Sequence, residues 1–245
     1  MIFGYVLLFS VIAGVGSAVL AGAILLAPER FRKSALPWLV SFAAGALMGA
    51  AFGQLMPEAI EKIGDPYRAS LTFLAGVIIF LVLERVILYH HCHNHDCHEH
   101  TVVGPLLLLG DALHNFVDGV AIAAAFLAGP STGIAVALAV LSHEVPQEVG
   151  NVVILLDSGF SRARAFGYNV LSNSAAVVGA VLGYWFLRKM DVLVPYVMGI
   201  SAASFIYIAA ADLLPNLHRK GRSTLSQLLV LLAGVGMMLL LRDEH

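Results

Sequence analysis

Residues 103–128 read VGPLLLLGDALHNFVDGVAIAAAFLA, an apolar stretch long enough to cross a lipid bilayer as a helix. Polar side chains interrupt it at His114-Asn115 and at Asp118, and the next apolar stretch contains His143-Glu144-Val145-Pro146-Gln147-Glu148. A charged side chain at the bilayer centre costs about 2.5–3.5 kcal/mol even on insertion scales. Groups this unfavourable in lipid indicate a functional site, and metal binding is the obvious candidate.

The composition of the chain is that of a membrane protein. Of its 245 residues, 59% are hydrophobic and 12% are charged, whereas a soluble domain is about 25% charged. Charged residues, prolines and glycines divide the chain into eight segments of roughly 20 residues, the length of a helical span. The predicted spans are residues 3–27, 37–60, 69–89, 103–128, 132–156, 163–187, 193–214 and 224–241.

The apolar segments predict helices rather than strands of a β-barrel. A barrel strand alternates apolar and polar residues over about 10 positions, and residues 71–83 show no such alternation. No Lys or Arg precedes the first segment, which continues to Ala27, so we interpret it as a retained helix rather than a signal peptide. The sequence therefore predicts an all-α integral membrane protein with a single transmembrane domain over residues 1–245.

The distribution of Lys and Arg predicts the orientation. With eight spans and both termini on one side, nine basic residues lie in the loops of the opposite side and five lie on the side of the termini. Because basic residues favour the cytoplasmic side, both termini are predicted to be extracytoplasmic. The net charge of −2 gives no indication of a nucleic-acid partner.

The connection at residues 90–100 reads HHCHNHDCHEH and is predicted to be cytoplasmic. Imidazole, thiolate and carboxylate groups are ligands that zinc prefers. One interpretation is a solvated low-complexity loop, and the other is weak, exchangeable metal capture. We favour capture, because ligand-type residues also occur inside the spans. A disulfide between Cys92 and Cys97 is not expected in the cytoplasm.

Small residues at four-residue spacing predict close packing of several helices. The three stripes are Ser41, Gly45, Gly49 and Gly53; Gly14, Ala18 and Gly22; and Ala175, Gly179 and Gly183. Gln54-Leu55-Met56-Pro57 near the end of the second span also resembles Asp212-Leu213-Leu214-Pro215 at the end of the seventh. Such an internal echo is typical of the inverted repeats of transporters.

The polar residues of the fourth and fifth segments fall on helical stripes. Asp111, His114, Asn115 and Asp118 follow i, i+3, i+4, i+7, whereas His143, Gln147 and Asn151 are four residues apart, with Glu144 and Glu148 on the adjoining row. If the stripes face each other, His114, Asp118, His143 and Gln147 surround one point and suit zinc. Asn115, Glu144 and Glu148 then form an adjacent all-oxygen position. The alternative is that these groups only hydrogen-bond one another and fix the helix register.

Pro146 has no N–H to donate to the carbonyl of Ser142, so a bend of the fifth helix is expected there. A carbonyl freed beside ligand-type side chains is typical of ion sites in membrane proteins.

These motifs resemble the ZIP family of divalent-metal transporters, whose fourth helix carries HNxxD and whose fifth carries HExPHE. The matching residues are 114–118 and 143–148. The resemblance extends over the whole chain, because residues 42–47 and 57–59 are similar to the second helix of that family, and residues 202–207 and 212–215 to its seventh.

The resemblance implies eight transmembrane helices in a 3+2+3 arrangement, with inverted repeats of helices 1–3 and 6–8 and both termini outside. It implies transport of zinc, or of iron, manganese or cadmium, toward the cytoplasm by an elevator-type movement of helices 1, 4, 5 and 6, in a homodimer of the plasma (inner) membrane. His114, Asp118, His143 and Gln147 match the first metal position of the family, Asn115 and Glu144 match the second, and Asp118 is able to bridge the two.

The chain departs from the family pattern at three places. Gln147 replaces the last histidine of HExPHE with an uncharged oxygen ligand, which shifts the expected preference toward harder ions. Ala50 and Gln54 stand where many relatives carry an aspartate and a histidine, so Glu58 is expected to attract cations at the mouth instead. In the sixth helix, Asn173 and hydroxyls stand where some relatives supply a carboxylate, so Glu148 is expected to compensate.

Two other functions are compatible with parts of the sequence. His143-Glu144 begins a motif that an intramembrane metal-dependent hydrolase uses, with Glu144 as general base, but the motif needs a second histidine at position 147. A metal sensor or store built around residues 90–100 would not explain carboxylates inside the spans. Transport is therefore the predicted function, and we do not expect an enzyme.

Overall fold

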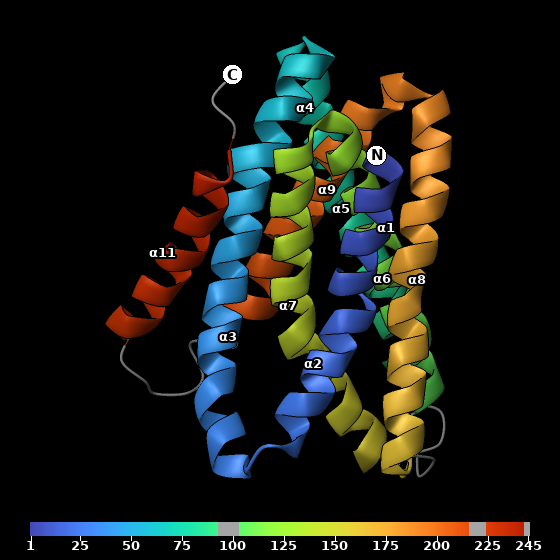
Figure 1. The fold of residues 1–245 in the computed structure, drawn as a ribbon, viewed down its shortest axis with the longest axis vertical. Helices are drawn as coiled ribbons and strands as arrows, with labels where there is room; N and C mark the ends of the chain where they lie inside the picture. The colour runs from blue at the N-terminus through green and yellow to red at the C-terminus, as the bar shows by residue number, and fades with distance from the viewer. Residues whose placement is uncertain (93–102, 216–223, 243–245) are drawn as a thin grey trace.

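The structure is a computed structural model that describes residues 1–92, 103–215 and 224–242, and over these ranges the chain forms long helices that run along the molecule (Figure 1). The α-helices are α1 (Ile2–Ala13), α2 (Val15–Leu26), α3 (Glu29–Ala50), α4 (Met56–Ile63), α5 (Pro66–Cys92), α6 (Val103–Ala128), α7 (Pro130–Asp157), α8 (Arg162–Lys189), α9 (Val194–Ile208) and α11 (Thr224–Leu240). Three short helices connect them, namely η1 (Ala51–Leu55), η2 (Asp191–Leu193) and η3 (Ala209–Leu213).

Within the described ranges, six helical stretches are long and apolar enough to cross a membrane. They are Ile2–Leu26, Glu29–Ile63, Pro66–Leu83, Leu107–Ala128, Arg162–Lys189 and Asp191–Ala211. The apolar stretch of α11, Leu225–Leu240, is shorter than these six. Helix α7 is as long as a span, but side chains such as His143, Glu144 and Gln147 lower its hydropathy. The chain is therefore a multi-pass helical membrane protein, as predicted.

The first predicted span differs from the expectation of one uninterrupted helix. The structure divides it at Gly14, between α1 and α2, and Ser17 Oγ donates to the Gly14 carbonyl over 2.5 Å. The same hydroxyl lies 3.1 Å from Asn173 Oδ1 on α8. A Cβ atom on Gly14 would lie 2.7 Å from the Asn173 carbonyl, so the backbones of the first span and α8 approach closely at this break.

Small residues bring the helices together, as the four-residue spacing predicts. A Cβ atom on Gly45 of α3 would overlap the Leu231 carbonyl of α11, and one on Gly49 would lie 2.8 Å from Met238 Cβ. A Cβ atom on Gly179 of α8 would overlap the Phe116 carbonyl of α6. Two helix pairs, α3 with α11 and α6 with α8, are therefore in backbone contact.

The sequence echo of the second and seventh predicted spans has the same local structure in both places. The π-helices η1 and η3 each precede a proline, Pro57 in α4 and Pro215 after η3. Proline lacks the N–H that would bond the carbonyl one turn earlier, which favours a widened turn there. Gln54 of η1 also donates to the Met238 carbonyl of α11 over 3.0 Å. The two similar sequences therefore share the same local structure, and the inverted repeat that they suggest stays a prediction.

Helix α1 begins and α11 ends at one end of the molecule, which also holds α4 and the turn between α6 and α7 (Figure 1). The opposite end holds the turns from α2 to α3 and from α7 to α8 (Figure 1). Most of the predicted His-rich loop, residues 93–100, lies outside the described residues. Helices α6 and α7, which contain the fourth and fifth predicted spans, run antiparallel in the middle of the bundle, where they position the candidate site.

Candidate metal centre

Four side chains of metal-ligating type converge between α6 and α7. His114 and Asp118 come from α6, and His143 and Glu144 come from α7, with one possible ligand atom of each within 4.8 Å of the others. His143 Nε2 lies 3.1 Å from Asp118 Oδ2, and His114 Nε2 lies 3.3 Å from Glu144 Oε1. The two Nε2 atoms are 3.3 Å apart. These distances place two imidazoles and two carboxylates around one point.

The local sequence explains how each ring and carboxylate is presented. His114 and Asp118 are one turn apart on α6, so their side chains lie on the same face of the helix. The Nδ1 atom of His143 lies 3.1 Å from the Ala139 carbonyl one turn earlier on α7, which leaves Nε2 directed at Asp118. A hydrogen bond to the second ring nitrogen orients a histidine for metal binding. The His143 ring also packs near Phe205 of α9, with centroids 6.1 Å apart.

The centre is almost entirely shielded from solvent. Asp118 and His143 are each 1% exposed and Glu144 is 0% exposed, whereas His114 is half-buried. Glu144 Oε2 has no hydrogen-bond partner among the described residues. Buried carboxylates need a compensating positive charge, because desolvation of an unpaired charge costs several kcal/mol. A divalent cation beside Asp118 and Glu144 would supply that charge.

The structure adds Glu144 to the residues around the first predicted position. The sequence pattern assigns Gln147 to the first position and Glu144 to an adjacent one. The structure brings the Glu144 carboxylate to His114 as well. Gln147 is half-buried one turn beyond His143 on α7, and its assignment to the first position stays a prediction. Pro146, where a bend is expected, does not end the helix, because α7 continues on both sides of the proline.

Asn115 and Glu148, which are predicted to form an all-oxygen position with Glu144, are both 0% exposed. Asn115 Nδ2 donates to the Asp111 carbonyl over 3.2 Å, and Asn115 Oδ1 has no hydrogen-bond partner among the described residues. Glu148 Oε1 accepts from Asn151 over 3.4 Å, and Glu148 Oε2 also lacks a partner there. Two buried oxygen atoms are therefore available next to the centre.

Ser172 of α8 is one of the hydroxyl residues that stand where some relatives supply a carboxylate, and the structure shows which group it contacts. Its hydroxyl donates to Asp111 Oδ2 over 2.5 Å and lies 3.0 Å from the Leu108 carbonyl. Serine is common in membrane helices, and nothing in the spacing of α8 connects this residue with Asp111 on α6. Only the close approach of the two helices does so.

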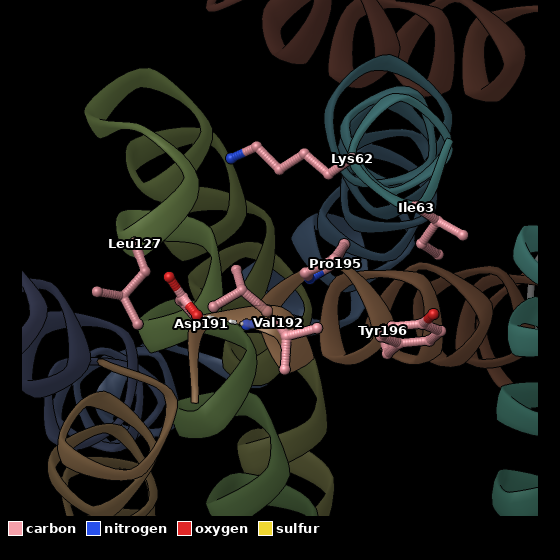
Figure 2. Close-up of a pocket in the computed structure, with 8 residues that line it drawn as sticks. Lys62, Ile63, Leu127, Asp191, Val192, Pro195 and Tyr196 are labelled. Atoms are coloured by element: carbon pink, nitrogen blue, oxygen red, sulfur yellow. Dashed lines mark hydrogen bonds between the residues drawn. The ribbon is translucent and has the colours of Figure 1, made fainter. Parts of the chain in front are cut away.

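The predicted role of Glu58 at the mouth is not favoured by its contacts. Lys62 Nζ lies 2.8 Å from Glu58 Oε1, so a cation is already paired with this carboxylate. Lys62 also lines a cavity of about 460 Å³ beside η2 and the start of α9, with Leu127 and Asp191 on the other side (Figure 2). Leu127 is nine residues beyond Asp118, about 13 Å along α6, so this cavity is separate from the metal centre.

A family model described as ZIP Zinc transporter matches residues 88–242, which include both motif-bearing helices. This chain belongs to the ZIP family. The ZIP family consists of transporters rather than enzymes, and the members similar to this chain are named zinc transporters. The intramembrane hydrolase that the sequence left open is not supported.

Several zinc transporters are similar to this ZIP chain. The zinc transporter ZIP13 of Pongo abelii is 32% identical over 225 residues, which are 84% of this chain and 66% of that protein. The zinc transporter foi of Drosophila melanogaster is 38% identical over 144 residues, 58% of this chain. Human zinc transporter ZIP10 is 34% identical over 146 residues, 54% of this chain. The chain spans 20% of the length of foi and 18% of ZIP10.

Proposed function

We propose that this protein moves divalent metal cations, zinc foremost, across a membrane toward the cytoplasm through the centre between α6 and α7. The observation that carries the proposal is the convergence of His114, Asp118, His143 and Glu144 within 4.8 Å inside helices of a ZIP-family membrane protein. Two carboxylates offset the charge of a divalent cation, and two imidazoles favour borderline metals such as zinc.

The remaining predicted ligands are expected to contribute around this primary position. Gln147 offers an amide oxygen one turn from His143. Asn115 and Glu148 offer buried oxygen atoms that have no hydrogen-bond partner among the described residues. Iron, manganese and cadmium are alternative substrates. The affinity of such a ligand set follows the general affinity order of the divalent metals, so the ligands alone do not select one biological substrate.

We propose an elevator-type movement, in which one group of helices slides against the other, within eight transmembrane helices in the 3+2+3 arrangement. The eight spans comprise the six apolar stretches together with α7 and α11. The moving block comprises the first span with α6, α7 and α8, and the static part includes α3 and α11. Backbone contact at Gly179 holds α6 to α8, and backbone contact at Gly45 holds α3 to α11, which supports two separately rigid groups.

The chain is expected to lie in the plasma (inner) membrane with both termini outside, as the count of basic residues predicts. The common end of α1 and α11 supports placing the termini on one side (Figure 1). We also propose a homodimer in the lipid bilayer. Chemical crosslinking in native membranes tests it, since a dimer band independent of expression level supports the proposal and a monomer alone contradicts it.

The decisive experiment measures zinc uptake into vesicles that contain the purified protein. His143→Ala and Asp118→Ala are expected to reduce uptake to the level of empty vesicles, because each removes a ligand from the centre. Glu144→Gln keeps the size of the side chain but removes a charge, and is expected to weaken apparent zinc affinity at least about tenfold, or about 1.4 kcal/mol.

Asp157→Ala is the matched control, because Asp157 is exposed at the end of α7 and lies outside the centre. Uptake by this variant should equal that of the unchanged protein. Gel filtration of each variant in detergent separates loss of transport from loss of folding. Undiminished flux in folded His143→Ala and Asp118→Ala proteins would rule out this centre as the pathway.

A further inference from the structure

The cavity beside η2 and the start of α9 brings together residues from four separate elements. Its volume of about 460 Å³ lies within the roughly 300–1,000 Å³ that is usual for small-molecule sites. The transport pathway proposed above makes no use of it. Its lining includes Lys62 and Ile63 of α4, Leu127 of α6, Asp191 and Val192 of η2, and Tyr196 of α9.

A positive charge enters the cavity from α4. The Lys62 side chain extends toward the part of α6 that carries Leu127 (Figure 2). Lys62 Nζ lies 2.8 Å from Glu58 Oε1, and this ion pair uses one of the three donors of the ammonium group. The other donors remain able to bind a second carboxylate, so the Lys62 side of the cavity suits an anionic group of a ligand.

A negative charge enters the same cavity from η2. Asp191 Oδ1 accepts from the backbone N–H of Val192 over 2.9 Å, and no cationic side chain in the described part of the chain pairs with this carboxylate. An ionised carboxylate has about four lone-pair sites, so Asp191 is able to bind a cationic group of a ligand. Lys62 and Asp191 thus line one cavity without pairing with each other.

Apolar side chains form the walls between the two charges. Ile63 and Leu127 are half-buried, and Val192 is 66% exposed, so each has surface that a ligand would remove from water. A purely anionic ligand would be repelled by Asp191, and a purely cationic one by Lys62. A small zwitterion with an aliphatic chain complements both charges and the walls, and free aliphatic amino acids have this chemistry.

The cavity also lies between the two groups of helices that slide in the proposed movement. Leu127 is near the end of α6, and Asp191 directly follows α8, and both helices belong to the moving block. Lys62 belongs to α4, which continues from α3 of the static part within the single stretch Glu29–Ile63. A molecule held between Lys62 and Asp191 therefore contacts both groups and opposes their sliding.

We propose that this cavity binds a free aliphatic α-amino acid and that the bound amino acid slows metal transport. The ligand carboxylate pairs with Lys62, the ligand ammonium pairs with Asp191, and the aliphatic chain packs against Leu127 and Val192. Charge-assisted hydrogen bonds of this kind are among the stronger ones. The binding itself depends only on the cavity, whereas the effect on transport rests on the function proposed above.

Binding of radiolabelled L-leucine to the purified full-length protein tests the site. A chelator is present throughout, so leucine held by bound metal does not contribute to the signal. Saturable binding is expected, and its absence would overturn the proposal. Leucinamide lacks the carboxylate and N-acetylleucine lacks the ammonium, so each should compete at least tenfold less well than leucine. Equal competition by either compound would mean that only one charge is recognised, which also overturns the proposal.

Paired variants locate the bound leucine. Asp191→Asn and Lys62→Gln should each weaken leucine binding at least tenfold, because each removes one of the two charges. Asp157→Asn and Lys189→Gln are the matched controls, since they make the same chemical changes at exposed positions that do not line the cavity, and both should leave binding unchanged. Binding that is insensitive to Asp191→Asn and Lys62→Gln would place leucine elsewhere and overturn the proposal.

Leu127→Trp tests the cavity without a change of charge. The larger side chain is expected to fill part of the space and to weaken leucine binding at least tenfold, whereas unchanged binding would exclude the cavity as the site. Gel filtration in detergent reports whether the variant is folded. Should Leu127→Trp fail to fold, the exposed charge variants Asp191→Asn and Lys62→Gln still decide the question.

Zinc uptake into vesicles measures the effect on transport. With free zinc held constant, saturating leucine should lower the maximal rate of uptake at least several-fold in the unchanged protein. In Asp191→Asn, the leucine concentration that halves uptake should rise at least tenfold, and in Asp157→Asn it should stay the same. Chelation of zinc by leucine would act equally on every variant, so equal inhibition of Asp191→Asn and the unchanged protein would overturn the effect on transport.

The same measurements distinguish failure of the amino-acid site from failure of the transport function. Vesicles with the unchanged protein that take up no divalent metal would contradict transport, even where leucine binds as expected. Normal zinc uptake by a protein that binds no leucine would contradict the amino-acid site alone.

Discussion

At the scale of single residues, position 147 sets the metal preference in our interpretation. Gln147 stands where the family motif has a histidine, and it lies one turn from His143 on α7. Its amide oxygen is a harder ligand than an imidazole nitrogen. The two carboxylates and two imidazoles of the centre are in place without it, so the residue modifies the site rather than creating it.

Gln147→His is expected to raise the preference for zinc over manganese at least several-fold, because imidazole favours zinc more than it favours manganese. Uptake of zinc in the presence of increasing manganese measures this ratio. Gln147→Leu is the control, since it removes the amide oxygen without adding a nitrogen ligand, and it should not raise the preference for zinc. An unchanged ratio in Gln147→His would exclude the side chain at position 147 from the coordination sphere.

At the scale of helices, glycines determine which pairs pack most closely, because a glycine has no side chain to hold the facing backbone away. Gly179 of α8 and Gly119 of α6 allow carbonyl groups of the facing helix to occupy the space of a Cβ atom. This close approach brings Ser172 into hydrogen-bond contact with Asp111 and so connects α8 with the polar residues of α6. Association of helices in lipid depends on such packing rather than on burial of apolar surface.

Gly179→Ala is expected to destabilise the protein by about 1–3 kcal/mol, the usual cost of overpacking. Its new methyl group would overlap the Phe116 carbonyl, and backbone cannot move aside as a flexible side chain can. Gly167→Ala on the same helix has no atom within 4 Å of the added Cβ and should be neutral. Thermal unfolding in detergent, followed by gel filtration after heating, compares the two. Equal stability of both variants would contradict the close contact.

At the scale of the whole molecule, the orientation decides the direction of transport. The two cysteines of the chain, Cys92 and Cys97, are close together in sequence and belong to the predicted cytoplasmic segment. They therefore provide a natural probe of sidedness. In intact cells, a membrane-impermeant maleimide should leave the protein unlabelled, and labelling should appear once the membrane is opened.

The control for this experiment places a cysteine at the other end of the bundle. Asp191→Cys, with Cys92 and Cys97 replaced by serine, is expected to react in intact cells, because Asp191 is exposed in η2 between α8 and α9. The turn from α8 to α9 lies at the end that holds the start of α1 (Figure 1). Labelling of Cys92 and Cys97 in intact cells would reverse the predicted orientation and the direction of transport with it.

The His-rich segment is an accessory to transport in our interpretation. Deletion of residues 90–100 is expected to change the apparent affinity or the regulation of uptake while flux continues, because the ligands between α6 and α7 remain. Concentration-dependent zinc uptake into cells, corrected for the amount of protein at the surface, measures both quantities. Complete loss of flux in a folded protein would place this segment on the conduction path.

Much of the fold follows from local properties of the sequence. Apolar runs locate the long helices, and each residue of a helix turns by a constant angle, so the stripe that contains His114 and Asp118 follows from their spacing alone. The ends are less predictable. Helix α3 begins at Glu29 rather than at residue 37, because about two largely polar turns precede the apolar part of the helix. The break at Gly14 depends on the approach of α8.

The sequence by itself determined a helical membrane protein, the residues able to bind a metal and the faces on which they lie, because hydropathy and helical periodicity are properties of neighbouring positions. Only the tertiary structure decided that the Glu144 carboxylate reaches His114, and that the Ser172 hydroxyl bonds Asp111. Those contacts depend on how one helix is rotated against another. That rotation is set by glycine contacts between segments far apart in the chain.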